Sequence, residues 1–193
     1  MFIRSKRLFL RPGWAEDWQE LAAAIADPSV VRNLARVPWP FQGKHAQDFL
    51  ALDHAPDAPS FLITLPGAQG APIIGGAGLY RQGEAVELGY WIAPGHWGRG
   101  YASEAVRAML SIARGLGHTR IVASHFIDNQ ASGRVLEKSG FQRTGRVYEC
   151  FSEGRGLAYP VREYAIALDR PAGSSDDGDG SGDDGAMISK RAA

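Results

Sequence analysis

The sequence predicts an α/β fold in which helices flank a mixed, mostly antiparallel β-sheet of about seven strands. Three apolar, strand-like runs at 60–66, 72–80 and 85–93 follow one another and are separated by Gly, Pro and polar turns, as consecutive antiparallel strands are. An amphipathic helical pattern at 101–116 then leads to a further strand-like run at 120–126. Strands interleaved with helices in this way are typical of a layered α/β domain.

The first part of the chain combines one strand with several short helices. Apolar and polar residues alternate loosely over 2–10, which predicts a strand. Helical spacing of apolar residues predicts a helix at 17–26, closed by an Asp-Pro pair, and a second short helix is expected at 30–34. A proline-interrupted aromatic loop at 37–44 precedes a helix predicted at 45–52.

The second part supplies the long helix and the end of the sheet. The helix at 101–116 has an apolar face, so we expect it to pack on the sheet. Because it forms a crossover, the strand at 120–126 should run parallel to the strand before the helix. A short helix is expected from 128 to 138, capped by Asp and Asn at its start. The runs 141–151 and 157–168 are predicted as a closing pair of strands.

Length and composition predict a single domain followed by a tail. The chain has 193 residues, of which 45% are hydrophobic and 22% are charged, enough for one well-filled core. We assign the domain to 1–170 and expect 171–193, rich in Gly, Ser and Asp, to be disordered. The chain is neutral and the tail is acidic, so the body carries a net charge of roughly +3, too small to predict a nucleic-acid groove.

Cysteine, histidine and hydropathy patterns exclude several kinds of site. Cys150 is the only cysteine, which excludes an internal disulfide, favours a reducing compartment and suits a strand residue better than a nucleophile. The five histidines lack the paired spacing of metal ligands, so we expect no metal. No window approaches the roughly 18 apolar residues of a membrane span. We therefore expect a cytoplasmic protein that binds neither membranes nor nucleic acid.

The stretch PGHWGRGYASEA, at 94–105, places three glycines between a strand and a helix. Backbone N–H groups at a helix start lack internal partners and lie at the positive end of the helix dipole, so such a turn attracts phosphate. A tight structural turn is the alternative. Tyr101-Ala102 stands where a P-loop needs Lys and Ser or Thr, and Ser103 stands where the dinucleotide fingerprint needs its third glycine. A different phosphate-bearing ligand is needed.

Two blocks of sequence stand in a characteristic order, ELGYWIAPGHWGRGYASEA at 87–105 and DNQASGRVLEKSGF at 128–141. Together they resemble the GNAT superfamily of acetyl-CoA-dependent N-acetyltransferases, specifically its ribosomal-protein N-terminal acetyltransferase (RimJ/RimL-like) branch. The resemblance covers residues 3–169. The family's acetyl-CoA loop, Gln/Arg-x-x-Gly-x-Gly/Ala, corresponds to 97–102, and Trp97 departs from the first position. The departure affects a side-chain contact, whereas the loop acts mainly through its backbone.

The resemblance implies acetyl-CoA as the co-substrate, and it implies where the cofactor lies. Its pyrophosphate would rest on backbone N–H groups of 98–102 at the start of the helix. Its pantetheine arm would complete the ladder of the strand at 90–92, where two strands splay apart. Asn129 would contact the cofactor, cap its own helix, or do both. The implied cofactor-binding residues are Tyr90, Trp91, Ile92, Trp97, Gly98, Arg99, Gly100, Tyr101, Ala102 and Asn129.

Two catalytic side chains are implied by the same resemblance. Glu87 would act as general base through a water relay, and the alternative is an ordinary solvated strand residue. The second helix lacks the tyrosine that many relatives use as general acid. Ser132 resembles the serine suggested for that role in the ribosomal-protein branch, and its alternative is a polar residue in the first helical turn. A backbone N–H near Ile92 would polarise the thioester carbonyl.

The predicted function is the transfer of acetyl to a primary amine by direct attack in a ternary complex. The acceptor is left open between a protein or peptide N-terminus and a small amine. Trp39 and Phe41 would contact it or form local core, and the segments 36–44 and 149–160 would shape the choice. The alternative functions are an acyl-CoA-binding module without turnover and, more remotely, a nucleotide-binding protein. A homodimer is compatible with the sequence.

Overall fold

A computed structural model of the chain describes residues 1–68 and 70–169, so the tail predicted at 171–193 lies outside the described residues. Within them, one mixed sheet has eight strands in the order β1-β2-β3-β4-β5-β6-β8-β7. The strands are β1 (Ile3–Arg4), β2 (Phe9–Arg11), β3 (Ser60–Thr64), β4 (Ile73–Gln82), β5 (Ala85–Ile92), β6 (Arg120–Phe126), β7 (Gln142–Ser152) and β8 (Leu157–Ala167). The pair β5–β6 is parallel, as the helical crossover predicts.

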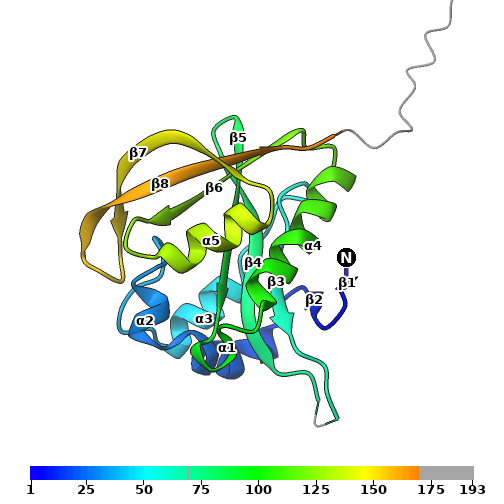
Figure 1. Ribbon diagram of the computed structural model, residues 1–193. Coiled ribbons are helices and arrows are strands. Elements are labelled where there is room, and N and C mark those ends of the chain that lie inside the picture. Colours follow the sequence, from blue (N-terminus) through cyan, green and yellow to red (C-terminus); the bar gives the residue numbers. More distant parts are fainter. Residues whose placement is uncertain (69, 170–193) are drawn as a thin grey trace, which may run out of the picture.

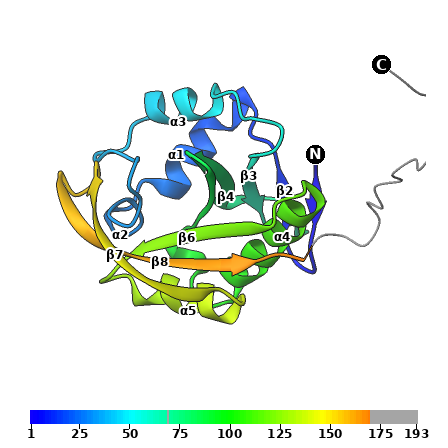
Figure 2. The ribbon, with the colours of Figure 1, turned by 90° about the horizontal axis from the view of Figure 1, so that it is seen from above.

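Helices cover both faces of this sheet. In Figure 1, α4 and α5 lie on one face, and Figure 2 shows α1 and α3 on the opposite face with the strands between the two layers. The helices are α1 (Trp18–Ile25), α2 (Pro28–Val31), α3 (Gly43–Leu50), α4 (Tyr101–Gly115) and α5 (Gln130–Lys138). The predicted α/β layer architecture is therefore confirmed, although α3 begins and ends two residues before the predicted range 45–52.

The N-terminal strand predicted at 2–10 is instead two strands joined by a tight turn, which gives eight strands in place of about seven. The amide of Ser5 donates to the carbonyl of Leu8 at 3.0 Å, and the amide of Leu8 donates to the Ser5 hydroxyl at 3.1 Å. Because these bonds reverse the chain, β1 pairs with β2 rather than continuing into it. Alternating polarity does not distinguish one strand from two short ones, so the pattern misses the turn.

Two apolar clusters hold the helices on the sheet. The larger lies under α4 and α5, where Val106, Met109 and Leu136 are fully buried. The smaller lies under α1 and α3 and includes Leu21 and Leu62. A fully buried side chain of this kind contributes about 1.5–3 kcal/mol, so both helical layers are held firmly in place.

The central strands β5 and β6 separate soon after they meet. Their described pair joins Glu87 to Val122. Beyond it, β5 continues to Ile92 against β4, while β6 pairs with β8 along its whole length. The sheet therefore opens as a V, and the chain passes from the open end of β5 into α4.

Candidate active site

The open edge of β5 offers backbone groups to a ligand. The amide of Ala93 donates to the carbonyl of Ile74 on β4 at 2.8 Å. Bonded and non-bonded pairs alternate along an antiparallel ladder, so Trp91 is also bonded to β4, whereas Tyr90 and Ile92 direct their N–H and C=O groups into the V. Of the predicted segment 90–92, these two residues face the V with their backbones, and Trp91 packs its side chain in the smaller core cluster.

The turn into α4 presents a row of backbone N–H groups. Gly98 and Gly100 have φ angles of 73° and 78°, in the left-handed region that favours glycine. Within residues 1–68 and 70–169, nothing accepts a hydrogen bond from the N–H groups of 98–103, and the first helical bond runs from the Glu104 amide to the Gly100 carbonyl at 3.1 Å. Such donors at the positive end of a 15-residue helix form a site for an anion.

Trp97, which departs from the family's loop pattern, fastens the loop to β5. Its indole Nε1 donates to the carbonyl of Ile92 at 2.5 Å, although the residue is 49% exposed. The bond engages the Ile92 carbonyl and leaves the Ile92 amide directed into the V. The side chain of Trp97 therefore takes a positioning role that the sequence did not indicate.

Helix α5 brings Asn129 and Ser132 toward β5. The side chain of Asn129 accepts from the Ser132 amide at 3.2 Å and so caps α5, which is one of the two roles weighed for it. The hydroxyls of Ser132 and Tyr90 lie 2.8 Å apart, and the Tyr90 hydroxyl also donates to the Ser132 carbonyl at 3.1 Å. The side chains of Tyr90 and Ser132 therefore connect β5 with α5.

The sequence predicts a backbone role for Tyr90 and gives no sign of the contacts of its hydroxyl. Burial raises the pKa of Tyr90 to about 12, against the opposing effect of its hydrogen bond with Ser132. The phenol therefore stays protonated at neutral pH. Since Tyr90 and Ser132 are 42 residues apart, no local pattern indicates that they meet.

Glu87 lies at the vertex of the V, where β5 and β6 pair. Its carboxylate accepts a hydrogen bond from Gln82 Nε2 at 2.6 Å and another from Ser124 Oγ at 2.7 Å. The two bonds engage different oxygens, and a carboxylate oxygen can accept more than one hydrogen bond. Glu87 is therefore held in place while its oxygens can still accept a further hydrogen bond, such as one from a water molecule.

Three ionisable side chains lie close enough to Glu87 to be affected by its charge. Burial raises the pKa values of Tyr80, Tyr148 and Cys150, and the negative charge of Glu87 acts in the same direction on each. All three therefore stay neutral at physiological pH. They come from β4 and β7, so the sequence carries no local signal that they gather here.

The hairpin between β7 and β8 is tied to the region after α2 by one arginine. Arg155, whose side chain is 9% exposed, donates to both carboxylate oxygens of Asp128 at 3.0 and 2.9 Å and to the carbonyl of Arg32 at 2.6 Å. Its guanidinium lies 4.6 Å from the ring centre of Phe126 and 4.5 Å from that of Tyr159. A planar guanidinium suits this combination of bidentate pairing and stacking.

The two segments predicted to shape the acceptor choice lie side by side. The amide of Glu153, in the segment 149–160, donates to the carbonyl of Ala35 at 2.9 Å, immediately before the segment 36–44. In Figure 1 this hairpin reaches toward the α2 region from the far edge of the sheet. The contact joins segments more than a hundred residues apart, and their role as a wall of the acceptor site, the acceptor wall, stays a prediction.

The two aromatic residues predicted to contact the acceptor have different surroundings. Phe41 packs against the smaller core cluster, and its ring centre lies 5.5 Å from that of His45. Trp39 is 45% exposed. The contacts of Phe41 fit its local-core alternative, and a substrate contact by Trp39 stays a prediction.

The comparisons with known proteins identify the family of the chain. The model of the Acetyltransferase (GNAT) domain matches residues 7–142. The chain belongs to this GNAT family. An uncharacterized N-acetyltransferase of Bacillus subtilis, YoaA, is 39% identical over 98 residues, which are 50% of this chain and 55% of that protein. The match thus spans about half the length of this curated relative.

Solved structures carry the same fold. A GNAT-family acetyltransferase from Bacillus anthracis is 26% identical with a TM-score of 0.74, over 86% of this chain and 98% of that one. RimL, a ribosomal L7/L12 alpha-N-protein acetyltransferase solved with coenzyme A, is 20% identical with a TM-score of 0.69, over 89% and 100%, which shows the fold alone. The GNAT fold and the acetyltransferase class are confirmed, while the RimJ/RimL-like branch stays a prediction.

Two features are absent from the part of the chain that the structure describes. No helix in residues 1–68 and 70–169 combines the length and the apolar character needed to cross a membrane. In the same residues, no three His, Cys, Asp or Glu side chains are grouped as ligands for a metal ion.

Proposed function

We propose that this GNAT protein moves acetyl from acetyl-CoA to a primary amine by direct attack in a ternary complex. The observation that carries the proposal is the V between β5 and β6, which combines two kinds of group. Unpaired backbone N–H groups of 98–103 lie at the mouth of the V, and the carboxylate of Glu87 lies at its vertex. Such an arrangement would give an anionic thioester and a base for the attacking amine separate places.

Backbone groups would bind the cofactor. The pyrophosphate of acetyl-CoA would accept hydrogen bonds from the N–H groups of 98–102. The pantetheine arm would pair with the outward backbone groups of Tyr90 and Ile92 as an added strand. The amide of Ile92, whose carbonyl is already engaged by Trp97, would then donate to the thioester oxygen as charge develops on it.

The transfer itself needs a proton acceptor and support for the leaving sulfur. Glu87 would accept the proton of the amine through a water molecule as the nitrogen attacks the carbonyl carbon. The C–S bond then breaks, and Ser132, next to the protonated Tyr90, would donate a hydrogen bond to the departing thiolate. General acid–base assistance of this kind contributes about 10²–10⁴ in rate.

The acceptor would approach from the face of the sheet that carries Glu87. This face is bounded by the loop 36–44 and the hairpin segment 149–160, which are joined through Ala35. We propose a peptide or protein N-terminus as the acceptor, because the motifs resemble those of the ribosomal-protein branch. A small amine is the competing outcome of the test below.

A thiol-release assay with acetyl-CoA tests the proposal directly. We expect coenzyme A release to depend on an added amine, with peptides that carry a free N-terminus turned over faster than the same peptides blocked at the N-terminus. Turnover restricted to polyamines, amino acids or aminosugars would replace the peptide acceptor by a small one. Binding of coenzyme A in calorimetry without turnover on any amine would indicate a binding module, and binding of ATP or NAD in its place would overturn the proposal.

A further inference from the structure

Arg7 lies beside the phosphate loop although 92 residues separate them in the sequence. Its Nη1 donates to the carbonyl of Arg99 at 2.9 Å, and its guanidinium lies 4.6 Å from the ring centre of Tyr101. Both contacts fall in the turn that carries the unpaired N–H groups. Arg7 therefore connects the turn between β1 and β2 with the beginning of α4.

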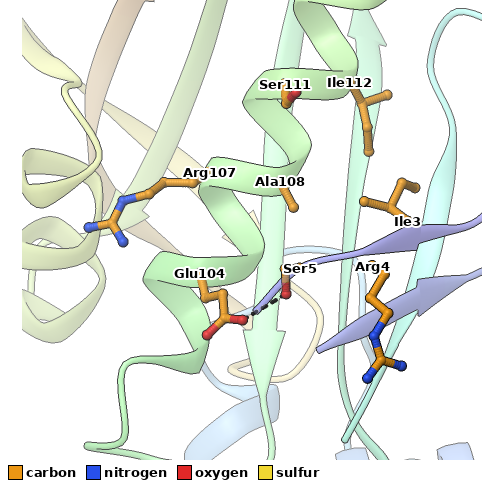
Figure 3. A pocket seen from close by; sticks show the side chains of 8 residues that line it. All are labelled: Ile3, Arg4, Ser5, Glu104, Arg107, Ala108, Ser111 and Ile112. Atoms are coloured by element: carbon orange, nitrogen blue, oxygen red, sulfur yellow. Dashed lines mark hydrogen bonds between the residues drawn. The ribbon is translucent and has the colours of Figure 1, made fainter. Parts of the chain in front are cut away.

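Glu104 and Ser5 hold Arg7 in this position. One oxygen of the Glu104 carboxylate accepts from the amide of Arg7 and from the hydroxyl of Ser5, both at 2.7 Å, and the other accepts from Arg7 Nε at 2.7 Å. Figure 3 shows Glu104 turned toward Ser5, in the wall of a groove of about 420 Å³. The carboxylate is thus drawn toward β1, and α4 begins without a side-chain cap on its N–H groups.

The charge of Glu104 is maintained by the same contacts. Burial alone would raise the pKa of Glu104, but hydrogen bonds from Ser5 and Arg7 outweigh it and lower the pKa. Glu104 is therefore ionised at neutral pH. A bare carboxylate in the first turn of α4 would repel a phosphate, and the adjacent guanidinium compensates that charge.

The bond from Arg7 to the Arg99 carbonyl also has a geometric effect. The carbonyl of Arg99 and the N–H of Gly100 belong to one planar trans peptide and point in opposite directions. A donor that fixes the carbonyl therefore fixes the direction of the N–H. This matters because the flanking glycines are conformationally free, and a Cβ built at Gly98 would have no neighbour within 4 Å. The contact of Arg7 therefore restrains a loop whose glycines permit other backbone conformations.

We infer that Arg7, held by Glu104 and Ser5, positions the Arg99–Gly100 peptide so that the loop is preorganised for the pyrophosphate of acetyl-CoA. The inference rests on the proposed function and adds a residue that lies outside both sequence blocks of the family resemblance. Preorganisation lowers the entropy lost on binding. The role requires arginine, because its planar fork donates to the carboxylate and to the carbonyl at once, whereas lysine offers one flexible ammonium.

Calorimetric titration with coenzyme A tests the inference on Arg7→Lys and Arg7→Ala. We expect the Kd for coenzyme A to rise about tenfold in both, the size of one lost hydrogen bond to a charged group. Pantetheine, which lacks the pyrophosphate, should bind each variant as it binds the wild type, with affinities measured by NMR titration. The Gly100 amide resonance should also shift in the free variants, because its peptide is no longer held.

Arg11 provides a matched control on the other end of β2. It contacts the Asp17 carboxylate at 2.6 and 2.8 Å, the Pro12 carbonyl at 3.1 Å and the Trp14 ring centre at 4.1 Å. Arg11→Lys therefore removes the same kinds of contact, but with residues 12–17 rather than with the loop. We expect it to leave the affinity for coenzyme A within about twofold of the wild type.

The outcomes separate the inference from the proposed function. Wild-type affinity for coenzyme A in Arg7→Lys would show that positive charge alone is needed and would overturn the positioning role. A parallel loss of coenzyme A and pantetheine binding, with a lowered melting temperature, would also overturn it by indicating a general structural role. A wild-type protein that binds no coenzyme A would overturn the proposed function and the inference together.

Discussion

The mouth and the vertex of the V are built from different parts of the chain. At the mouth, the donors are backbone N–H groups of one short segment, 98–103, at the start of α4. At the vertex, Glu87 is surrounded by side chains from three other strands, including Ser124 and Tyr148. The donors at the mouth therefore come from one local segment, whereas the groups at the vertex come together through the packing of distant elements.

This difference has a chemical reason. A pyrophosphate is the same in every reaction that uses acetyl-CoA, and backbone donors recognise it whatever the neighbouring side chains are. Acceptor amines differ in size and charge, so their recognition needs side chains and movable loop segments. In the proposed reaction, the cofactor half therefore depends on a motif that can be recognised in the sequence, and the acceptor half on the segments 36–44 and 149–160.

The largest expected effect is at the vertex. Glu87→Gln removes the proposed proton acceptor, and we expect kcat to fall about 10²–10³-fold with the KM for acetyl-CoA unchanged. Steady-state kinetics with the best acceptor from the amine panel would measure both. Glu84→Gln, in the exposed turn before β5, is the control and should keep wild-type kinetics. Full turnover in Glu87→Gln would assign Glu87 to the solvated-residue alternative.

The next effect tests whether the acceptor wall is separate from the mouth. Arg155→Ala leaves Asp128 without its bidentate partner, and we expect the free energy of unfolding to fall by about 2 kcal/mol. The KM for the acceptor should rise while the Kd for coenzyme A stays constant, as measured by denaturant titration, kinetics and calorimetry. Arg146→Ala removes a 65% exposed guanidinium paired with Glu163 and should cost less than about 0.5 kcal/mol. Equal losses in both variants would contradict the role of Arg155.

The same contrast explains how much the sequence predicts. The spacing of apolar residues identifies the strands and the helix between β5 and β6, because this spacing is a pattern within each element. The order of these elements then predicts the layers and the parallel crossover. The glycines at 98 and 100 indicate the loop because their conformation is local. The turn at Ser5–Leu8 is missed because short strands carry almost no pattern.

Contacts between distant side chains leave no such local trace. The bond between Arg7 and Glu104 joins residues 97 positions apart, and the contact of Tyr90 with Ser132 spans 42. Each of these residues is compatible with an ordinary surface or strand position when it is considered alone. Such pairs follow from the tertiary fold, so the sequence predicts the backbone donors of the loop but not the side-chain contacts around the V.

A smaller effect is expected from one methyl group at the mouth. Gly98→Ala places a Cβ on a residue with φ of 73°, which costs about 1 kcal/mol of backbone strain. The loop would turn to relieve this strain, and we expect coenzyme A to bind about fivefold more weakly. Gly95→Ala is the matched control, because its Cβ also meets open space and its φ lies outside the left-handed region. The affinities for coenzyme A that calorimetry measures should therefore differ between the two variants. Equal affinities would mean that the loop tolerates a side chain at Gly98, against the requirement for glycine there.

The smallest expected effect is a loss of stability at acidic pH. Carboxylates in ion pairs titrate in this range, whereas backbone N–H groups do not. The hydrogen bond from Arg155, aided by the charges of Arg155 and Arg32 and opposed by burial, lowers the pKa of Asp128 below its ordinary value. The unfolded carboxyl therefore binds a proton before the folded one as the pH falls. The stabilisation is complete well above the ordinary aspartate pKa of about 3.9 and is lost as the pH drops through the lower folded value.

Asp128→Asn should remove this pH dependence. The difference in unfolding free energy between wild type and variant should be constant from pH 7 to about 5 and shrink below about 4, by no more than roughly 1 kcal/mol since solvent screens the pair. Hydrogen exchange of the Glu153 amide, which is bonded to the carbonyl of Ala35, would measure the local stability of the acceptor wall. If the difference in unfolding free energy grew as the pH fell, the pKa of Asp128 would not be lowered in the folded state. That result would contradict the ion pair as the contact that holds the acceptor wall.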